Sequence, residues 1–155
     1  MSILHPLSWP LSLPPLLSTT LNVGVAIGGY TMAIPFYAPG IPGAMIATWF
    51  QRFFQPGLVS VMVLGITTLV TGVRAWWRLG ASASASRYAG LGLLFTFVHF
   101  GFGPLIVGCM ERMLKDSEVA HEEMRWWIQL HVTRTLIADV PAWLFFLNAL
   151  LREKV

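Results

Sequence analysis

The sequence predicts an all-α protein, a bundle of four helices integral to a membrane. Three observations lead to this fold class. Of the 155 residues, 55% are hydrophobic and only 11% are charged, whereas soluble domains carry roughly 25% charged residues. The mean hydropathy is +0.67. The first 51 residues contain no Lys, Arg, Asp or Glu. We expect one membrane domain that covers residues 1–155.

Four apolar stretches supply the expected helices. A helix needs roughly 20 apolar residues to cross about 30 Å of hydrocarbon, and in lipid it must satisfy its backbone amides internally. The stretches that meet this requirement are residues 16–37, 53–73, 88–110 and 126–151. The second has no Asp, Glu, Lys, Arg or His, and the third has only His99 from this group. The fourth contains three of them, His131, Arg134 and Asp139.

The connections between these stretches are short, so neighbouring helices should run antiparallel. Pro104 and Pro141 should bend the third and fourth helices and help to open a cavity. Four spans place both termini on one side of the membrane. That side has five Lys or Arg residues (Arg74, Arg78, Arg87, Arg152 and Lys154) and the other has four (Arg52, Arg112, Lys115 and Arg125). The positive-inside rule therefore predicts a multi-pass protein with both termini in the cytoplasm.

Several classes of protein are excluded by composition. The single cysteine, Cys109, cannot form an intrachain disulfide or a thiolate metal cluster. The few basic residues are scattered, which excludes the clustered surface that a nucleic-acid binder needs. The expected partners are instead the lipid bilayer and a lipophilic small molecule. Gly24 and Gly28 form a small face for close helix packing, and whether a second copy of the chain binds there stays open.

The ionisable residues inside the spans mark a candidate site. Each costs roughly 2.5–3.5 kcal/mol on insertion scales, so each needs a partner or a purpose. With His131 at 0° on a regular helix, Arg134 lies at about −60° and Asp139 at about +80°. Counting back from the hairpin between the third and fourth spans places His99 at the depth of Asp139. A carboxylate beside a histidine suits general acid/base catalysis, although a buried hydrogen bond with no catalytic role has the same geometry.

We therefore predict His99, His131, Arg134 and Asp139 as catalytic residues. The predicted substrate contacts are Asn22, Tyr30, Phe95, Phe100 and Trp127, in part because Phe95, Phe97, Phe100 and Phe102 could form an aromatic wall. No cofactor is predicted. His99, His131, Asp139 and Glu111 are residue types that bind iron, copper or zinc. The two histidines differ in expected depth by about 9 Å, which disfavours a single metal ion without deciding the question.

The fourth span also carries a resemblance to a known family. Trp127, His131 and Arg134, in the sequence WWIQLHVTR, resemble a motif of the small four-helix membrane proteins of the domain of unknown function 1772 superfamily, which includes anthrone oxygenases. The stretch WFQRFFQP at residues 49–56 is similar to the entrance of that family's second helix. At Glu111 the sequence departs from the asparagine that family members often carry. The resemblance implies a membrane enzyme of secondary metabolism that acts on a lipophilic polyketide or terpenoid.

Three functions remain open at this point. The first is an anthrone-oxygenase-like oxidation, in which a histidine removes a proton and Arg134 stabilises the resulting anion toward dioxygen. The second is a non-redox cyclase or isomerase that uses His99 and Asp139 as a proton relay. The third is a small proton-coupled transporter, or a scaffold subunit whose polar residues only fix helix packing.

Overall fold

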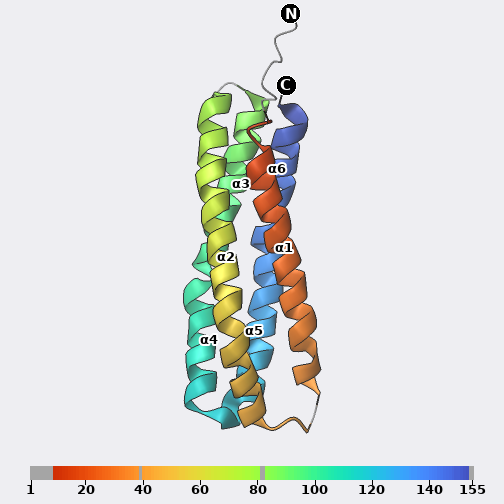
Figure 1. The fold of residues 1–155 in the computed structure, drawn as a ribbon, viewed down its shortest axis with the longest axis vertical. Helices are drawn as coiled ribbons and strands as arrows, with labels where there is room; N and C mark the ends of the chain where they lie inside the picture. The colour runs from red at the N-terminus through yellow and green to blue at the C-terminus, as the bar shows by residue number, and fades with distance from the viewer. Residues whose placement is uncertain (1–8, 39, 81–82, 154–155) are drawn as a thin grey trace, which may run out of the picture.

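The computed structural model describes residues 9–38, 40–80 and 83–153. The chain forms four long antiparallel helical rods, and both termini lie at the same end of the bundle (Figure 1). The four prolines among residues 1–15 predict an irregular segment at the membrane interface. Residues 1–8 of this segment lie outside the described residues, and its last three residues begin α1. The elements are α1 (Leu13–Ala33), η1 (Ile34–Tyr37), α2 (Gly43–Leu79), α3 (Ser84–Gly101), α4 (Gly103–Lys115), η2 (Ser117–Val119), α5 (Ala120–Arg134), η3 (Thr135–Asp139) and α6 (Val140–Arg152).

The all-α fold class is confirmed, and the described part of the chain contains no strand. Four helical segments are long and apolar enough to cross a membrane: Leu13–Phe36, Gly43–Leu79, Ser84–Lys115 and Ser117–Arg152. The expected second, third and fourth spans lie inside the corresponding segments, and the first, residues 16–37, ends one residue beyond its segment. The second helix is longer than expected because it begins at Gly43 and continues through Pro56.

The prolines explain where the rods are regular and where they are not. Pro14 and Pro15 lie in the first turn of α1, where a missing amide hydrogen costs nothing. In the third rod, helix α3 ends at Gly101 and α4 begins at Gly103, with Pro104 in its first turn. The fourth rod contains the π-helical turn η3 immediately before Pro141. Both irregularities lie near the middle of the bundle.

Two apolar clusters fill the interior. One lies toward the hairpin between the third and fourth rods and includes Phe50, Met113 and Trp127. The other lies toward the termini and includes Leu93 and Phe146. Along the rods most of the buried polar residues fall between these clusters: Asn22, Thr68, Thr96, His99, His131, Arg134 and Asp139. The buried His, Arg and Asp side chains therefore lie in the middle of the molecule, with apolar packing on both sides.

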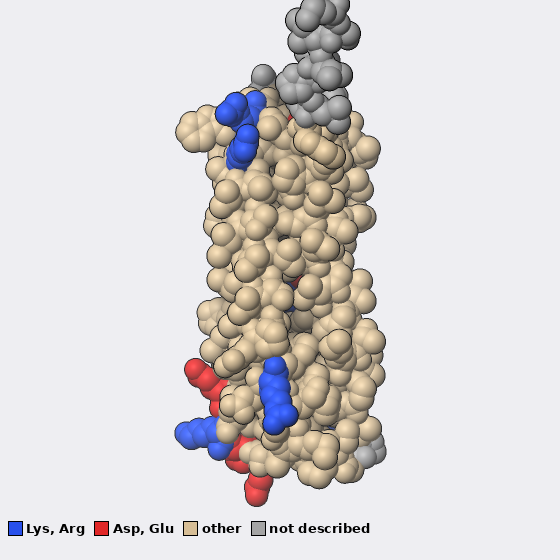
Figure 2. All heavy atoms as spheres, in the orientation of Figure 1, with Lys and Arg blue, Asp and Glu red and all other residues tan. Residues whose placement is uncertain are grey.

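The outer surface is the reverse of a soluble protein's surface. Figure 2 shows charged side chains near the two ends of the bundle and a long uncharged face between them. Large apolar side chains such as Val63, Val70 and Leu136 are exposed along the rods. Trp76 and Trp77 are exposed near one end, as expected for anchors at a membrane interface. These features support an integral, multi-pass membrane protein, whereas the cytoplasmic orientation of the termini stays a prediction.

Candidate functional site

Asp139 is the centre of the buried polar cluster. Its Oδ1 atom lies 2.5 Å from Nδ1 of His99 and accepts a hydrogen bond of 3.2 Å from Nδ2 of Asn22. Its Oδ2 atom forms an ion pair with Nε of Arg134 at 3.4 Å. Only 4% of Asp139 is exposed. The carboxylate therefore joins three helical rods, through α1, α3 and its own chain segment.

The π-helical turn brings Arg134 and Asp139 to the same side of the fourth rod. On a regular helix the two residues are about 140° apart. In η3 the backbone amide of Val140 bonds to the carbonyl of Thr135, the five-residue spacing of a π-helix. Residues five apart are then one turn apart. The ring of Pro141 would also clash with the carbonyl four residues earlier in a regular helix, and the wider turn relieves this conflict.

Both ring nitrogens of His131 are already occupied. Its Nε2 atom donates to the carbonyl of Ala26 at 2.8 Å, and its Nδ1 atom accepts from Nη2 of Arg134 at 3.3 Å. The imidazole stacks on the indole of Trp127 with 4.8 Å between ring centroids. A Cβ atom on Gly29 of α1 would lie 3.4 Å from Nε2 of His131, an ordinary van der Waals contact, so α1 packs directly against the imidazole. His131 therefore orients Arg134 and has no free nitrogen for proton transfer.

His99 has the opposite arrangement. Its Nδ1 atom is held by Asp139, which leaves the lone pair of a neutral imidazole on Nε2. Nε2 has no hydrogen-bond partner among the described residues. The edge of the His99 ring also meets the neighbouring Phe100 ring at an interplanar angle of 76°. Of the two histidines, His99 is the one that can accept or donate a proton at the cavity.

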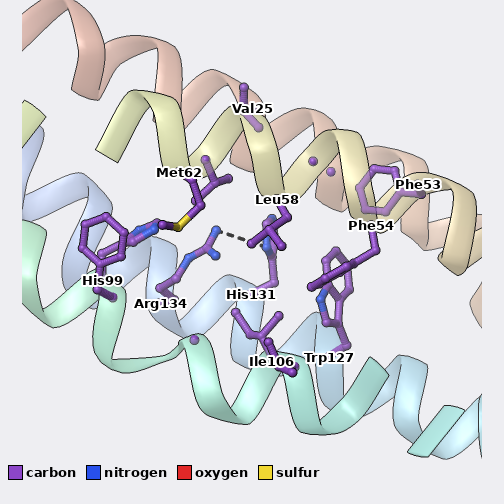
Figure 3. A pocket seen from close by; sticks show the side chains of 16 residues that line it. Val25, Phe53, Phe54, Leu58, Met62, His99, Ile106, Trp127, His131 and Arg134 are labelled. Atoms are coloured by element: carbon purple, nitrogen blue, oxygen red, sulfur yellow. Dashed lines mark hydrogen bonds between the residues drawn. The ribbon is translucent and has the colours of Figure 1, made fainter. Parts of the chain in front are cut away.

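A cavity of about 110 Å³ lies beside these residues, between α1, α2, α3, α4 and α5 (Figure 3). Arg134 points from the fourth rod toward His131, with His99 on one side and Trp127 on the other (Figure 3). Three of the lining side chains, Val25, Leu58 and Met62, are also exposed on the outside of the bundle. Figure 2 shows a small hollow about halfway along the apolar face, with charged atoms at its floor. The cavity therefore opens toward the lipid-facing surface.

The structure brings most of the predicted site residues together. His99, Phe100, Trp127, His131 and Arg134 line the large cavity. Asn22 and Asp139 line a second, smaller cavity, which His99 also borders.

Two predicted substrate contacts lie elsewhere. Tyr30 is 40% exposed on α1, and Phe95 stacks on Phe145 at 5.4 Å. Neither lines the two cavities. The expected aromatic wall is reduced to Phe100, since Phe97 is 58% exposed and Phe102 does not line the large cavity.

Other lining residues were absent from the sequence prediction. The apolar walls come mainly from α2 and α4, through Phe53, Phe54, Leu58, Met62 and Ile106. Of these residues, only Phe53 and Phe54 could have been found from the sequence, because they lie in the stretch at residues 49–56 that resembles a family's second-helix entrance. Glu111 is exposed and away from the site. Among the residues that the structure describes, no three His, Cys, Asp or Glu side chains are grouped to hold a metal ion.

Two curated proteins are similar to part of this chain. One is named epoxidase pydX, from Acremonium sp, and is 33% identical over 92 residues, which cover 57% of this chain and 54% of the relative. The other is named probable epoxidase scpX, from Mollisia scopiformis, and is 35% identical over 71 residues, or 44% of each chain.

The chain thus spans about half the length of the curated relatives it matches. No family model matches the chain, so membership of the domain of unknown function 1772 superfamily stays a prediction. No solved structure matches it either. What the comparisons establish is a partial similarity to two proteins named as epoxidases.

Proposed function

We propose that this protein is a membrane-embedded oxidative enzyme of secondary metabolism that transfers oxygen to an unsaturated, lipophilic small molecule. The observation that carries the proposal is the His99–Asp139 pair, whose free Nε2 atom borders an apolar cavity open to the lipid side. The names of the two relatives favour epoxidation over other oxidations. A polyketide or terpenoid with a carbon–carbon double bond is the expected substrate class.

The cavity size limits how much of the substrate is enclosed. Its volume of about 110 Å³ is below the roughly 150 Å³ of a protein cavity that binds benzene. A short alkenyl end of the substrate fits such a space. The rest of the substrate would extend past Val25, Leu58 and Met62 into lipid, so the enzyme would act on one end of a larger molecule.

Each polar residue has a distinct role in this proposal. His99 moves a proton at Nε2, and Asp139 holds the ring and stabilises its protonated form. Arg134 uses one Nη atom at His131 and its Nε atom near Asp139. Its Nη1 atom has no hydrogen-bond partner in the described part of the chain, so it can stabilise an oxygen anion of the substrate. His131 acts by positioning Arg134.

The two oxidations differ in the electrons they need. Epoxidation converts an alkene, dioxygen, two protons and two electrons into an epoxide and water, so it requires an external two-electron donor. Anthrone-type oxidation converts a methylene group and dioxygen into a ketone and water, and it needs no donor. We place epoxidation first and keep anthrone-type oxidation as the second candidate because of the resemblance in the fourth span.

The test is an oxygen-uptake assay on the full chain in nanodiscs. Alkene-containing terpenoids and polyketides, and anthrone, are supplied with and without NADPH and a reductase. We expect uptake with a product that has gained one oxygen atom as an epoxide. His99→Gln should lower the turnover by roughly 10²- to 10⁴-fold, the usual contribution of a positioned acid or base. His131→Gln is the matched comparison, and it should lower turnover less because an amide can still donate to Ala26.

The alternatives give different results in the same preparation. An isomeric product formed without dioxygen would identify a cyclase or isomerase, and the relatives' names do not favour that outcome. Proton-coupled accumulation of a solute in liposomes, with no product, would identify a transporter. Equal activity of His99→Gln and the wild type would rule out the proposed site.

A further inference from the structure

A second, polar cavity lies behind the His99–Asp139 pair, on the side of the pair toward the termini. Its volume is about 10 Å³, close to the minimum that holds one water molecule. His99 is the one side chain that borders both this cavity and the large one. The lining residues are Thr19, Asn22, Gly65, Thr68, Thr96, His99, Asp139 and Ala142.

Two acceptor atoms among the lining residues have no hydrogen-bond partner. They are Oδ1 of Asn22 and Oδ2 of Asp139, and both atoms are buried. Oδ2 of Asp139 also faces Nε of Arg134 at 3.4 Å, an ion pair that leaves this oxygen a lone pair for a second donor. Asn22 is only 8% exposed and Asp139 4%. The amide of Asn22 cannot simply be reversed, because its Nδ2 atom already donates to Oδ1 of Asp139 and an oxygen there would face the carboxylate. Buried polar atoms in native proteins nearly always have a partner, which is often an ordered water.

The hydroxyl groups around the cavity present acceptors as well. The hydroxyl of Thr19 donates to the carbonyl of Pro15 at 2.8 Å, and that of Thr96 donates to the carbonyl of Gly92 at 2.8 Å. These two hydroxyl groups can therefore only accept a hydrogen bond from a molecule in the cavity. Thr68 also donates to a carbonyl, that of Leu64 at 2.9 Å, but its hydroxyl oxygen lies 2.7 Å from that of Ser18 as well. When Ser18 donates to Thr68, the Thr68 proton can turn away from the Leu64 carbonyl, which keeps its helical amide partner, so Thr68 can donate a hydrogen bond into the cavity.

We propose that this cavity binds one water molecule, which donates to Asn22 and Asp139 and accepts from Thr68. Such a water satisfies both unpartnered acceptors and makes three hydrogen bonds, the usual number for a buried water. An apolar molecule cannot supply the two donors. Together with Arg134, the water holds Oδ2 of Asp139, and it thereby fixes the tautomer and orientation of His99.

The site also positions the catalytic pair, a part of the proposal that rests on the proposed function. When Nε2 of His99 accepts a proton, both ring nitrogens carry a proton and the negative charge of Asp139 balances the imidazolium. The water holds Oδ2 of Asp139 and so keeps Oδ1 against Nδ1 of His99. It therefore stabilises the protonated form of His99 by positioning the carboxylate.

Nuclear magnetic resonance of the full chain in nanodiscs tests the water site without any substrate. The sequence has two asparagines, Asn22 and Asn148, so labelling with ¹⁵N-asparagine gives two side-chain amide signals. We expect a cross-peak between the Asn22 amide and a long-lived water. Thr68→Val should weaken it severalfold, whereas Thr71→Val, one turn away and outside the cavity, should leave it unchanged. A wild-type spectrum without the cross-peak, or a cross-peak unaffected by Thr68→Val, would overturn the proposal.

The positioning role has its own readout in the turnover assay. Thr68→Val should lower kcat by about tenfold, less than the loss of the base itself, with KM unchanged because the large cavity is intact. Thr71→Val should behave as the wild type. An unchanged kcat in Thr68→Val, together with the expected loss of the water signal, would leave a structural water and remove its role in positioning the pair. If no oxidation occurs in the wild type, the spectra still decide the water site.

Discussion

Asp139 shows how single residues hold this site together inside a membrane. A carboxylate in a span costs roughly 2.5–3.5 kcal/mol on insertion scales, yet this one is almost completely buried. His99, Asn22 and Arg134 surround it with two hydrogen bonds and one ion pair. Removal of one member of a buried ion pair leaves the other charge uncompensated, which is more damaging than removal of both. The polar groups therefore depend on one another.

This dependence predicts the outcome of a double-mutant cycle. Asp139→Ala should lower the free energy of unfolding by about 3–5 kcal/mol, because Arg134 is left as an unpaired buried charge. Arg134→Met alone leaves the carboxylate with His99 and Asn22. The double variant should be markedly more stable than the sum of the single changes predicts. Unfolding by SDS titration, followed by tryptophan fluorescence, measures all three, and additive losses would contradict the proposed coupling.

At the scale of the helix, tight packing between α3 and α6 supports the site from the side of the termini. A Cβ atom on Gly92 would lie 2.8 Å from Cε2 of Phe146, and one on Gly72 would lie 2.8 Å from Cδ2 of Leu93. The Phe146 ring is fully buried, so it has little space in which to move. Gly72 and Gly92 are therefore two of the glycines at which an added side chain would overpack the bundle. At Gly24 and Gly28, which the sequence marked as a packing face, an added Cβ meets nothing within 4 Å.

The contrast between these glycines is testable with one kind of substitution. Gly92→Ala should destabilise the bundle, because overpacking costs about 1–3 kcal/mol and exceeds the gain in helix propensity, about 1 kcal/mol. Gly24→Ala is the matched control and should keep or raise the stability, because only the propensity gain applies. Thermal unfolding in detergent, followed by circular dichroism, compares the two. A Tm for Gly92→Ala at or above the wild-type value would contradict the packing described here.

The whole molecule is a rod with apolar sides and charged ends, which matches the apolar core and polar surfaces of a lipid bilayer. Helix α2 has 37 residues and is about 55 Å long at 1.5 Å per residue. It is therefore longer than the roughly 30 Å hydrocarbon core, and its ends reach the interfacial regions. Val63 lies near the middle of α2 and is 59% exposed, whereas Trp77 lies near its end and is 81% exposed. Position along the rod, rather than exposure, decides which substitutions the membrane tolerates.

Lysine substitutions at these two positions should separate the effects of depth and exposure. Val63→Lys should reduce membrane integration, because lysine at the centre of a span costs roughly 2.5–3.5 kcal/mol. Trp77→Lys should integrate normally, because its amine can reach the interface. Resistance to alkaline carbonate extraction measures integration of each variant. Equal extraction of the two proteins would show that Val63 does not face the hydrocarbon core.

The sequence by itself determined the fold class and the approximate positions of the spans. Few charges and four long apolar stretches leave helices as the simplest structure in lipid, since every backbone amide must be satisfied within the span. Depth could also be counted from the hairpin, and the structure does bring His99 into contact with Asp139. These inferences rest on length and composition, which require no knowledge of how side chains pack.

Only the tertiary structure decided the angular positions of side chains around the helices and which hydrogen-bond partner each histidine nitrogen has. The regular-helix calculation separated Arg134 from Asp139 by about 140°, because nothing in the sequence revealed that η3 would be a π-helical turn. The two histidines are the same residue type, yet His131 is fully bonded by Ala26 and Arg134 while His99 keeps a free nitrogen. Rotation and hydrogen bonding depend on contacts between distant segments, and those contacts exist only in the folded bundle.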